Sequence, residues 1–164
     1  MKQGFNAHDN ILSLIGKTPL IKLNKITKDF NGTHFCKYEA YNPGHSNKDR
    51  IALHIINKAE ESGLIDKYST IIETSSGNTG FSLSMIAMVK GYKCIVAVSS
   101  KSSIDKIDML KSMGAKVYVC PANVAADDSR SYYQVAKRLN EEIKDSFYVN
   151  PVSYTHLRAH ETVG

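Results

Sequence analysis

The sequence predicts an α/β fold in three layers, with a parallel sheet of four strands covered by helices on both faces. Two observations carry this prediction. Short segments rich in β-branched residues alternate with longer helical segments through residues 46–150. Gly63, Gly91 and Gly114 each close a helical segment before the next strand begins. Such alternation is typical of parallel sheets, because a parallel connection needs a crossover of about a dozen residues or more.

The elements can be assigned in order along the chain. The predicted strands cover residues 69–74, 92–100, 115–120 and 146–150, and the predicted helices cover 48–62, 78–90, 103–113 and 129–144. Two further β-rich segments, TPLIKL (18–23) and THFCKYEAY (33–41), come before them. They flank a turn-forming Asn31-Gly32 pair, and we therefore predict a hairpin there.

The composition excludes several classes of protein. No apolar run approaches the roughly 18–20 residues that span a bilayer, and residues 1–10 lack the apolar core of a signal peptide. The net charge of +5 is not concentrated in a basic stretch with aromatic residues, so neither a membrane nor a nucleic acid is predicted as a partner. Cys36, Cys94 and Cys120 are odd in number and far apart, which fits a reducing cytoplasm and argues against a disulfide framework or a metal site.

The segment ETSSGNTG (73–80) joins a predicted strand to a predicted helix. Backbone N–H groups at the start of a helix attract anions, and Gly77 and Gly80 allow a ligand to approach the backbone closely. Ser75, Ser76, Asn78 and Thr79 add side-chain donors. The segment therefore predicts a site for a small anion such as a carboxylate, or alternatively a helix N-cap with its usual Ser, Thr and Asn residues. The glycine and lysine spacings of nucleotide-binding loops are absent.

Lys48 opens a helix within the segment NPGHSNKDR (42–50). Ser46 and Asp49 have the spacing of a capping box, and in that interpretation Lys48 is a solvated surface charge. A lysine at the positive end of a helix is disfavoured by about 0.3–1 kcal/mol. That position suits an amine that must lose a proton before it attacks a carbonyl. The second interpretation makes Lys48 the covalent anchor of an aldehyde cofactor.

Four motifs together resemble the family of cysteine synthase and cystathionine β-synthase, enzymes that depend on pyridoxal 5'-phosphate (PLP). The motifs are IGKTPLIKLN (15–24), NPGHSNKDR (42–50), ETSSGNTG (73–80) and KSMGAK (111–116), in the order and spacing of the family. The resemblance covers residues 11–150. It implies PLP fold type II, with residues 46–150 as the smaller α/β domain. Residues 1–45 are then a hairpin segment of a larger domain whose remainder is missing.

The resemblance also implies roles for individual residues. Lys48 matches the lysine that binds PLP covalently and later removes the substrate α-proton as a base. Asn78 matches the asparagine that donates a hydrogen bond to the ring oxygen of the cofactor. Ser75, Ser76 and Thr79 match the loop that binds the substrate α-carboxylate. No metal site is implied.

The implied reaction is β-replacement, in which serine or O-acetylserine loses its β-substituent and a sulfur nucleophile adds. Sulfide as the nucleophile gives cysteine, and homocysteine gives cystathionine, as in a cystathionine β-synthase. A dehydratase for serine or threonine is a further alternative, and so is a non-catalytic domain that binds a small anion. Full-length relatives are usually homodimers.

The sequence departs from the family pattern at two positions. Family members often have a small residue, commonly glycine, where His45 stands, and valine where Asn47 stands. We interpret His45 either as a surface turn residue or as a residue that touches the substrate and titrates near neutrality.

Residues 151–164 form the end of the chain. Within them VSYTHLRAHET (152–162) resembles the translation of a transposon-end adapter used in DNA library preparation. We therefore expect residues 151–164 to be a non-native tail, and we expect the chain as written to have little or no activity alone.

Overall fold

The computed structural model describes residues 7–149. The expected tail of residues 151–164 lies outside this part of the chain. In order, the elements are η1 (Ile11–Leu14), β1 (Leu20–Leu23), β2 (His34–Lys37), η2 (Glu39–Tyr41), α1 (Lys48–Glu61), β3 (Thr70–Glu73), α2 (Asn78–Lys90), β4 (Lys93–Ser99), α3 (Ile104–Ser112), β5 (Lys116–Cys120), α4 (Tyr132–Glu142) and β6 (Ser146–Tyr148). The two η elements are short 3₁₀ helices. No helix among the described residues is both long enough and apolar enough to cross a membrane.

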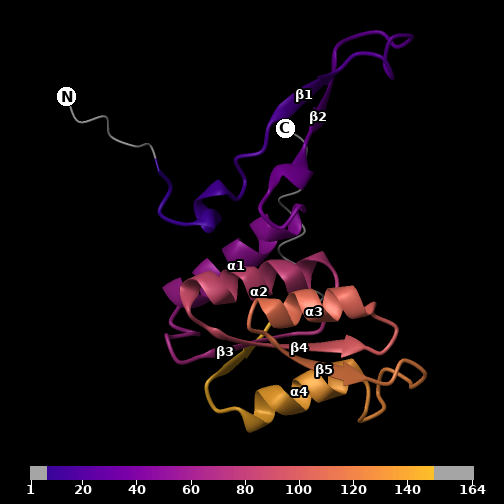
Figure 1. Cartoon of the computed structure of the whole chain (residues 1–164). Coiled ribbons are helices and arrows are strands. Elements are labelled where there is room, and N and C mark those ends of the chain that lie inside the picture. Colours follow the sequence, from indigo (N-terminus) through magenta and orange to yellow (C-terminus); the bar gives the residue numbers. More distant parts are fainter. Residues whose placement is uncertain (1–6, 150–164) are drawn as a thin grey trace, which may run out of the picture.

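The predicted parallel sheet is confirmed. Its four strands lie in the order β5-β4-β3-β6, and every neighbouring pair is parallel. Helices α1, α2 and α3 lie on one side of the sheet, and α4 covers the other side (Figure 1). The segment ETSSGNTG begins with the last residue of β3 and ends in the first turn of α2. It therefore lies at the carboxyl end of the parallel sheet.

Alternation along the strands divides the core between the two faces. Ile71 packs with apolar residues of α1 and α2, whereas its neighbour Ile72 packs with residues of α4. α2 contacts α1, α3 and the sheet, and its sequence is correspondingly apolar on nearly all sides. Its buried residues are Gly80 and the run from Ser82 to Ala87. The buried part of α2 begins at Gly80, so the helix is held in place directly after the predicted anion-binding segment.

The N-terminal hairpin is confirmed, but its second arm is shorter than predicted. β1 and β2 pair antiparallel from Leu20↔Lys37 to Leu23↔His34. Residues 39–41 form η2 instead of a strand, because Asn42 Nδ2 donates to the Glu39 carbonyl oxygen at 2.8 Å and closes a turn. The hairpin extends away from the sheet (Figure 1). Leu20 and Phe35 are 62% and 53% exposed, so the hairpin presents apolar side chains to solvent.

A partly buried polar network ties the hairpin segment to α1. Arg50 donates through Nε to Glu39 Oε2 at 2.7 Å and through Nη2 to Glu39 Oε1 at 2.9 Å. The same Nη2 donates to the Gly16 carbonyl oxygen at 2.9 Å. Thr18 Oγ1 donates to Glu39 Oε1 at 2.7 Å, and the Gly16 amide donates to Asn42 Oδ1 at 2.8 Å. The network thus joins the motif at 15–24 to the motif at 42–50.

We predict that Glu39→Gln destabilises the chain at pH 7 but hardly at pH 2. The Arg50 guanidinium lowers the pKa of Glu39 to about 2 from the usual value of 4.5. A depressed carboxyl pKa stabilises the fold above the unfolded pKa, and this contribution is lost as the pH falls from 4.5 towards 2. Allowing for the partial exposure of both side chains, we expect a loss of about 1–2 kcal/mol at pH 7. Urea unfolding followed by circular dichroism measures it; an equal loss at both pH values would contradict the assignment.

Candidate active site

Lys48 is the first residue of α1, as predicted, but the local capping differs from the predicted capping box. Ser46 Oγ accepts from the Lys48 amide at 3.2 Å, whereas a capping box would place that bond on the Asp49 amide. The Asp49 carboxylate does not return to Ser46 and is used elsewhere. Among residues 7–149, no side chain or backbone group forms a hydrogen bond or an ion pair with Lys48 Nζ.

The fully buried carboxylate of Asp49 connects the two helices of the candidate site. Asp49 Oδ2 accepts from the Gly44 amide at 2.5 Å, and Oδ1 accepts from the Ser82 hydroxyl. Ser82 Oγ also lies 2.8 Å from the Asn78 carbonyl oxygen. One carboxylate therefore holds the turn before Lys48 and the first turn of α2 together, so that the starts of α1 and α2 lie side by side.

The start of α2 is open. Gly77 is its N-cap and makes no side-chain capping bond. The amides of Asn78, Thr79 and Gly80 have no hydrogen-bond partner among the described residues. The interpretation of this loop as an ordinary Ser, Thr or Asn N-cap is therefore wrong, since none of these side chains caps the helix. Three unpaired amides at the positive end of a long helix are the geometry that binds an anion.

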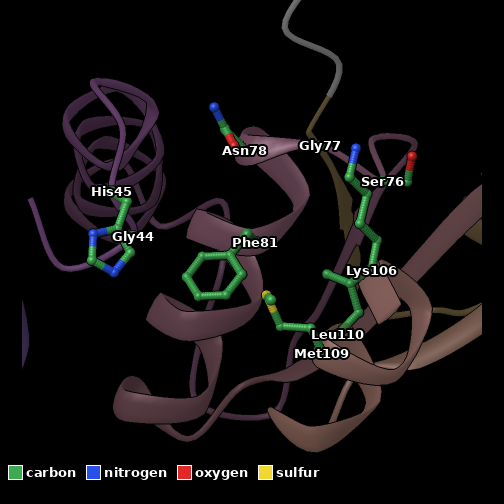
Figure 2. Close-up of a pocket in the computed structure, with 9 residues that line it drawn as sticks. All are labelled: Gly44, His45, Ser76, Gly77, Asn78, Phe81, Lys106, Met109 and Leu110. Atoms are coloured by element: carbon green, nitrogen blue, oxygen red, sulfur yellow. The ribbon is translucent and has the colours of Figure 1, made fainter. Parts of the chain in front are cut away.

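A cavity of about 500 Å³ lies beside this loop (Figure 2). The turn before α1, the first turn of α2 and the helix α3 each contribute to its wall. The lining residues are Gly44, His45, Ser76, Gly77, Asn78, Phe81, Lys106, Met109 and Leu110. The side chains of Phe81 and Met109 point towards each other across the apolar part of the wall. The polar groups come from the loop and from His45 and Lys106.

The structure brings the predicted site residues to one end of the α1–α2 pair, but it places them differently around the cavity. Ser76 and Asn78 line the cavity, whereas Lys48, Ser75 and Thr79 are not among its lining residues. Lys48 follows the lining residue His45 by three residues and opens α1. The sequence analysis did not identify Phe81 on α2, or Lys106 and Met109 on α3, as lining residues. The spacing of residues along a helix does not distinguish a cavity wall from a packed face or a solvated one.

His45 occupies a left-handed backbone conformation with φ 56°. It is the one residue other than glycine with positive φ among residues 7–149. Glycine adopts this conformation without steric cost, which accounts for the small residue common in the family at this position. His45 Nδ1 lies 3.2 Å from the Ala40 carbonyl oxygen, and the imidazole is exposed at the cavity wall. The ring is therefore placed to reach a ligand as well as to complete a turn.

Gly80 has a different role from the one predicted. A side chain at this position would collide with the carbonyl oxygen of Ser75, so the loop folds back over the helix only because residue 80 is glycine. Gly80 itself is buried. Gly77 has room for a Cβ, whose nearest neighbour would be Ser75 Oγ at 3.6 Å.

The residues at this end of the helices fit the PLP that the sequence resemblance implies. PLP carries an aldehyde, an aromatic ring with polar substituents and an anionic phosphate. Near the cavity are the amine of Lys48, which has no partner among residues 7–149, an amide donor at Asn78 and an apolar wall at Phe81 and Met109. The described residues therefore match the aldehyde and ring; they include no glycine-rich phosphate loop beyond residues 75–80.

Comparison with known proteins agrees with this fit. The family model described as pyridoxal-phosphate dependent enzyme matches residues 11–164. A cystathionine β-synthase of Dictyostelium discoideum is 46% identical over 147 residues, which are 87% of this chain and 30% of the relative. Cysteine synthase 1 of Emericella nidulans is 38% identical over 164 residues, which are 99% of this chain and 44% of the relative.

A solved structure shares the arrangement. A hydrogen sulfide-producing enzyme from Fusobacterium nucleatum superimposes with a TM-score of 0.78 at 37% identity, covering 87% of this chain and 45% of that one. The chain therefore spans less than half the length of these relatives.

We predict opposite effects for two substitutions of His45. His45→Gly is expected to keep the free energy of unfolding within about 1 kcal/mol of the parent or to raise it, because it removes a left-handed non-glycine residue. His45→Val is expected to lower it by about 1–3 kcal/mol, because a β-branched residue is strained at this φ. Urea unfolding followed by circular dichroism measures both, and equal stability of the two variants would show that the turn is not left-handed.

We also predict that Gly80→Ala destabilises the chain by about 1–3 kcal/mol, through the collision with the Ser75 carbonyl oxygen. The sign is informative, since Gly→Ala inside a helix ordinarily stabilises by about 1 kcal/mol. Gly77→Ala is the matched control and is expected to change the stability by less than about 1 kcal/mol. The same urea measurement compares them; a neutral or stabilising Gly80→Ala would mean that the loop does not fold over α2 as described.

Proposed function

The chain belongs to the family of pyridoxal-phosphate-dependent enzymes. We propose that residues 46–150 form the smaller domain, and residues 1–45 a segment of the larger domain, of an enzyme that replaces the β-substituent of serine or O-acetylserine with sulfur. The product proposed first is cysteine, formed with sulfide. One observation supports this most strongly: the Asp49 carboxylate bonds to both the Gly44 turn and Ser82, so the start of the helix that Lys48 opens is held beside the open start of α2.

Each residue has a part in the proposed reaction. Lys48 would hold the cofactor through its aldehyde, and its amine would serve as the base that takes the α-proton of the substrate. Asn78 donates a hydrogen bond to the cofactor ring oxygen. The loop around Ser75, Ser76 and Thr79, together with the free amides of α2, binds the substrate carboxylate. When bound, PLP supplies the electron sink for the negative charge that develops at Cα.

Orientation follows from these contacts. A carboxylate fixed at the start of α2 holds one end of the amino acid, and Lys48 stands at the start of the neighbouring helix. The α-hydrogen and the β-substituent then face the cavity, where Phe81 and Met109 limit access of water. His45 is placed at the opposite wall, where we propose that it contacts the entering nucleophile.

Homocysteine is the second candidate nucleophile. It is favoured by the 46% identity with the Dictyostelium cystathionine β-synthase, against 38% with the fungal cysteine synthase. We also propose that the longer enzyme is a cytoplasmic homodimer whose only ligands are small molecules. A non-catalytic anion-binding domain would need the same open start of α2 but would have no use for the unpaired amine of Lys48.

We predict that a chimera tests these roles. Residues 11–149 replace the matching segment of the Emericella cysteine synthase, and cysteine formation from O-acetylserine and sulfide is measured. We expect the chimera to be active and Lys48→Ala to lower kcat by about 10³-fold or more, because the anchor and the base are lost together. The 164-residue chain alone is expected to show no turnover.

Lys58→Ala is the matched control, since Lys58 is an exposed lysine of the same helix that pairs with Glu61. It is expected to keep the activity of the chimera. An active Lys48→Ala chimera would refute the assignment of the lysine. A second chimera places residues 11–149 in the Dictyostelium cystathionine β-synthase and compares the two nucleophiles. If this chimera keeps a larger fraction of its parent enzyme's activity than the Emericella chimera does, homocysteine is favoured over sulfide.

A further inference from the structure

Glu73 is a buried carboxyl that the proposed reaction does not use. It is the last residue of β3 and directly precedes the anion loop. Glu73 is 1% exposed. Oε1 accepts from the Thr74 amide at 2.9 Å, whereas Oε2 is buried and has no hydrogen-bond partner among residues 7–149. A buried oxygen without a partner disfavours the charged form of the group.

Of the titratable groups that face one another at the end of β3, Glu73 is the one that changes charge near pH 7. Burial raises its pKa to about 7, although the amides of Thr74 and Ser75 act in the opposite direction. The titratable groups that face it are Cys94 on β4 and Tyr148 on β6. Burial raises the pKa of Cys94 to about 11 and also raises that of Tyr148, so both are neutral at pH 7. α2, which covers this face, carries no titratable side chain before Lys90.

We propose that Glu73 is a positioning residue that couples uptake of one proton to the binding of one carboxylate at residues 74–79, an inference that rests on the carboxylate site proposed above. Oε1 of the charged Glu73 accepts from the Thr74 amide, and the bound carboxylate takes the amides of Asn78 and Thr79, which have no partner among the described residues. The two negative charges then lie on one short segment and repel each other. A proton from solvent on Oε2 removes the repulsion and breaks no hydrogen bond, because that oxygen has none.

The sign of the coupling follows from the charge of Glu73. Below about pH 7 the group is neutral and the loop binds a carboxylate without repulsion; above it the charged form opposes binding. Coupling between two binding events is reciprocal. We therefore expect acetate to bind about tenfold more weakly at pH 9 than at pH 6, and saturating acetate to raise the midpoint of Glu73 by about one pH unit.

The test uses the 164-residue chain labelled with ¹³C and ¹⁵N, and acetate as the probe. The carboxyl ¹³C resonance of Glu73 and the amide of Thr74 are followed by NMR from pH 5 to 9, with and without acetate, at constant ionic strength set by sodium chloride. We expect both signals to share a midpoint near 7 that acetate moves upwards. This measurement in the parent chain requires no variant to fold.

Three variants identify the source of the effect. In Glu73→Gln, the Thr74 amide is expected to lose its titration and acetate affinity to become independent of pH. Glu60→Gln, the matched control, removes a partly exposed glutamate that pairs with Lys90 and is expected to change neither. His45→Asn removes the imidazole at the cavity while keeping a residue that tolerates positive φ, and the coupling is expected to persist.

The outcomes distinguish this inference from the proposed function. If acetate leaves the amides of Gly77 and Asn78 unshifted at every pH, the carboxylate site is wrong and the coupling falls with it. If acetate shifts those amides but the midpoint of Glu73 does not move, the site stands and the coupling is overturned. Loss of the pH dependence in His45→Asn would also overturn it, since the titrating group would then be His45.

Discussion

The bond between the Asp49 carboxylate and the Ser82 hydroxyl is the contact on which the site depends. Asp49 is fully buried, so it must be satisfied inside the protein, and its partners come from two different segments. The Gly44 amide fixes the turn before α1, and Ser82 fixes the first turn of α2. Because a buried carboxylate is costly without both partners, the two helix starts cannot separate without a large loss of stability. Lys48 and the anion loop are held in one place as a consequence.

A second network connects α1 to the N-terminal hairpin segment, as Asp49 connects α1 to α2. Arg50 follows Asp49 directly and turns to the other side of α1, where it bonds to Glu39, Gly16 and Thr18. Two adjacent residues of one motif thus connect α1 to the segment before it and to the helix after it. The family motifs at 15–24, 42–50 and 73–80 are far apart in the sequence, and these side chains are the physical reason that they occur together.

The loop between β3 and α2 is half-buried or exposed along its length and buried only at its two ends, Glu73 and Gly80. Its two ends are fixed, by Glu73 bonded to the Thr74 amide and by Gly80 packed under the Ser75 carbonyl oxygen. Between these points Ser76, Gly77 and Asn78 line the cavity. A rigid loop with unpaired donors binds an anion without reorganising, which is the arrangement that favours both affinity and catalysis.

The sequence by itself determined the fold class, the order of the elements and the motifs. Hydrophobic periodicity and glycine stops are local signals, and they predicted the parallel sheet, the hairpin and the helix that Lys48 opens. Features that depend on contacts between distant residues could not be predicted from these local signals. The tertiary structure showed that Asp49 bonds to Ser82 instead of forming a capping box, that Gly80 accommodates a carbonyl oxygen, and that Glu73 is buried with one unpaired oxygen. Residues 39–41 became a 3₁₀ turn for the same reason, since Arg50 and Asn42 hold Glu39 more strongly than strand pairing would.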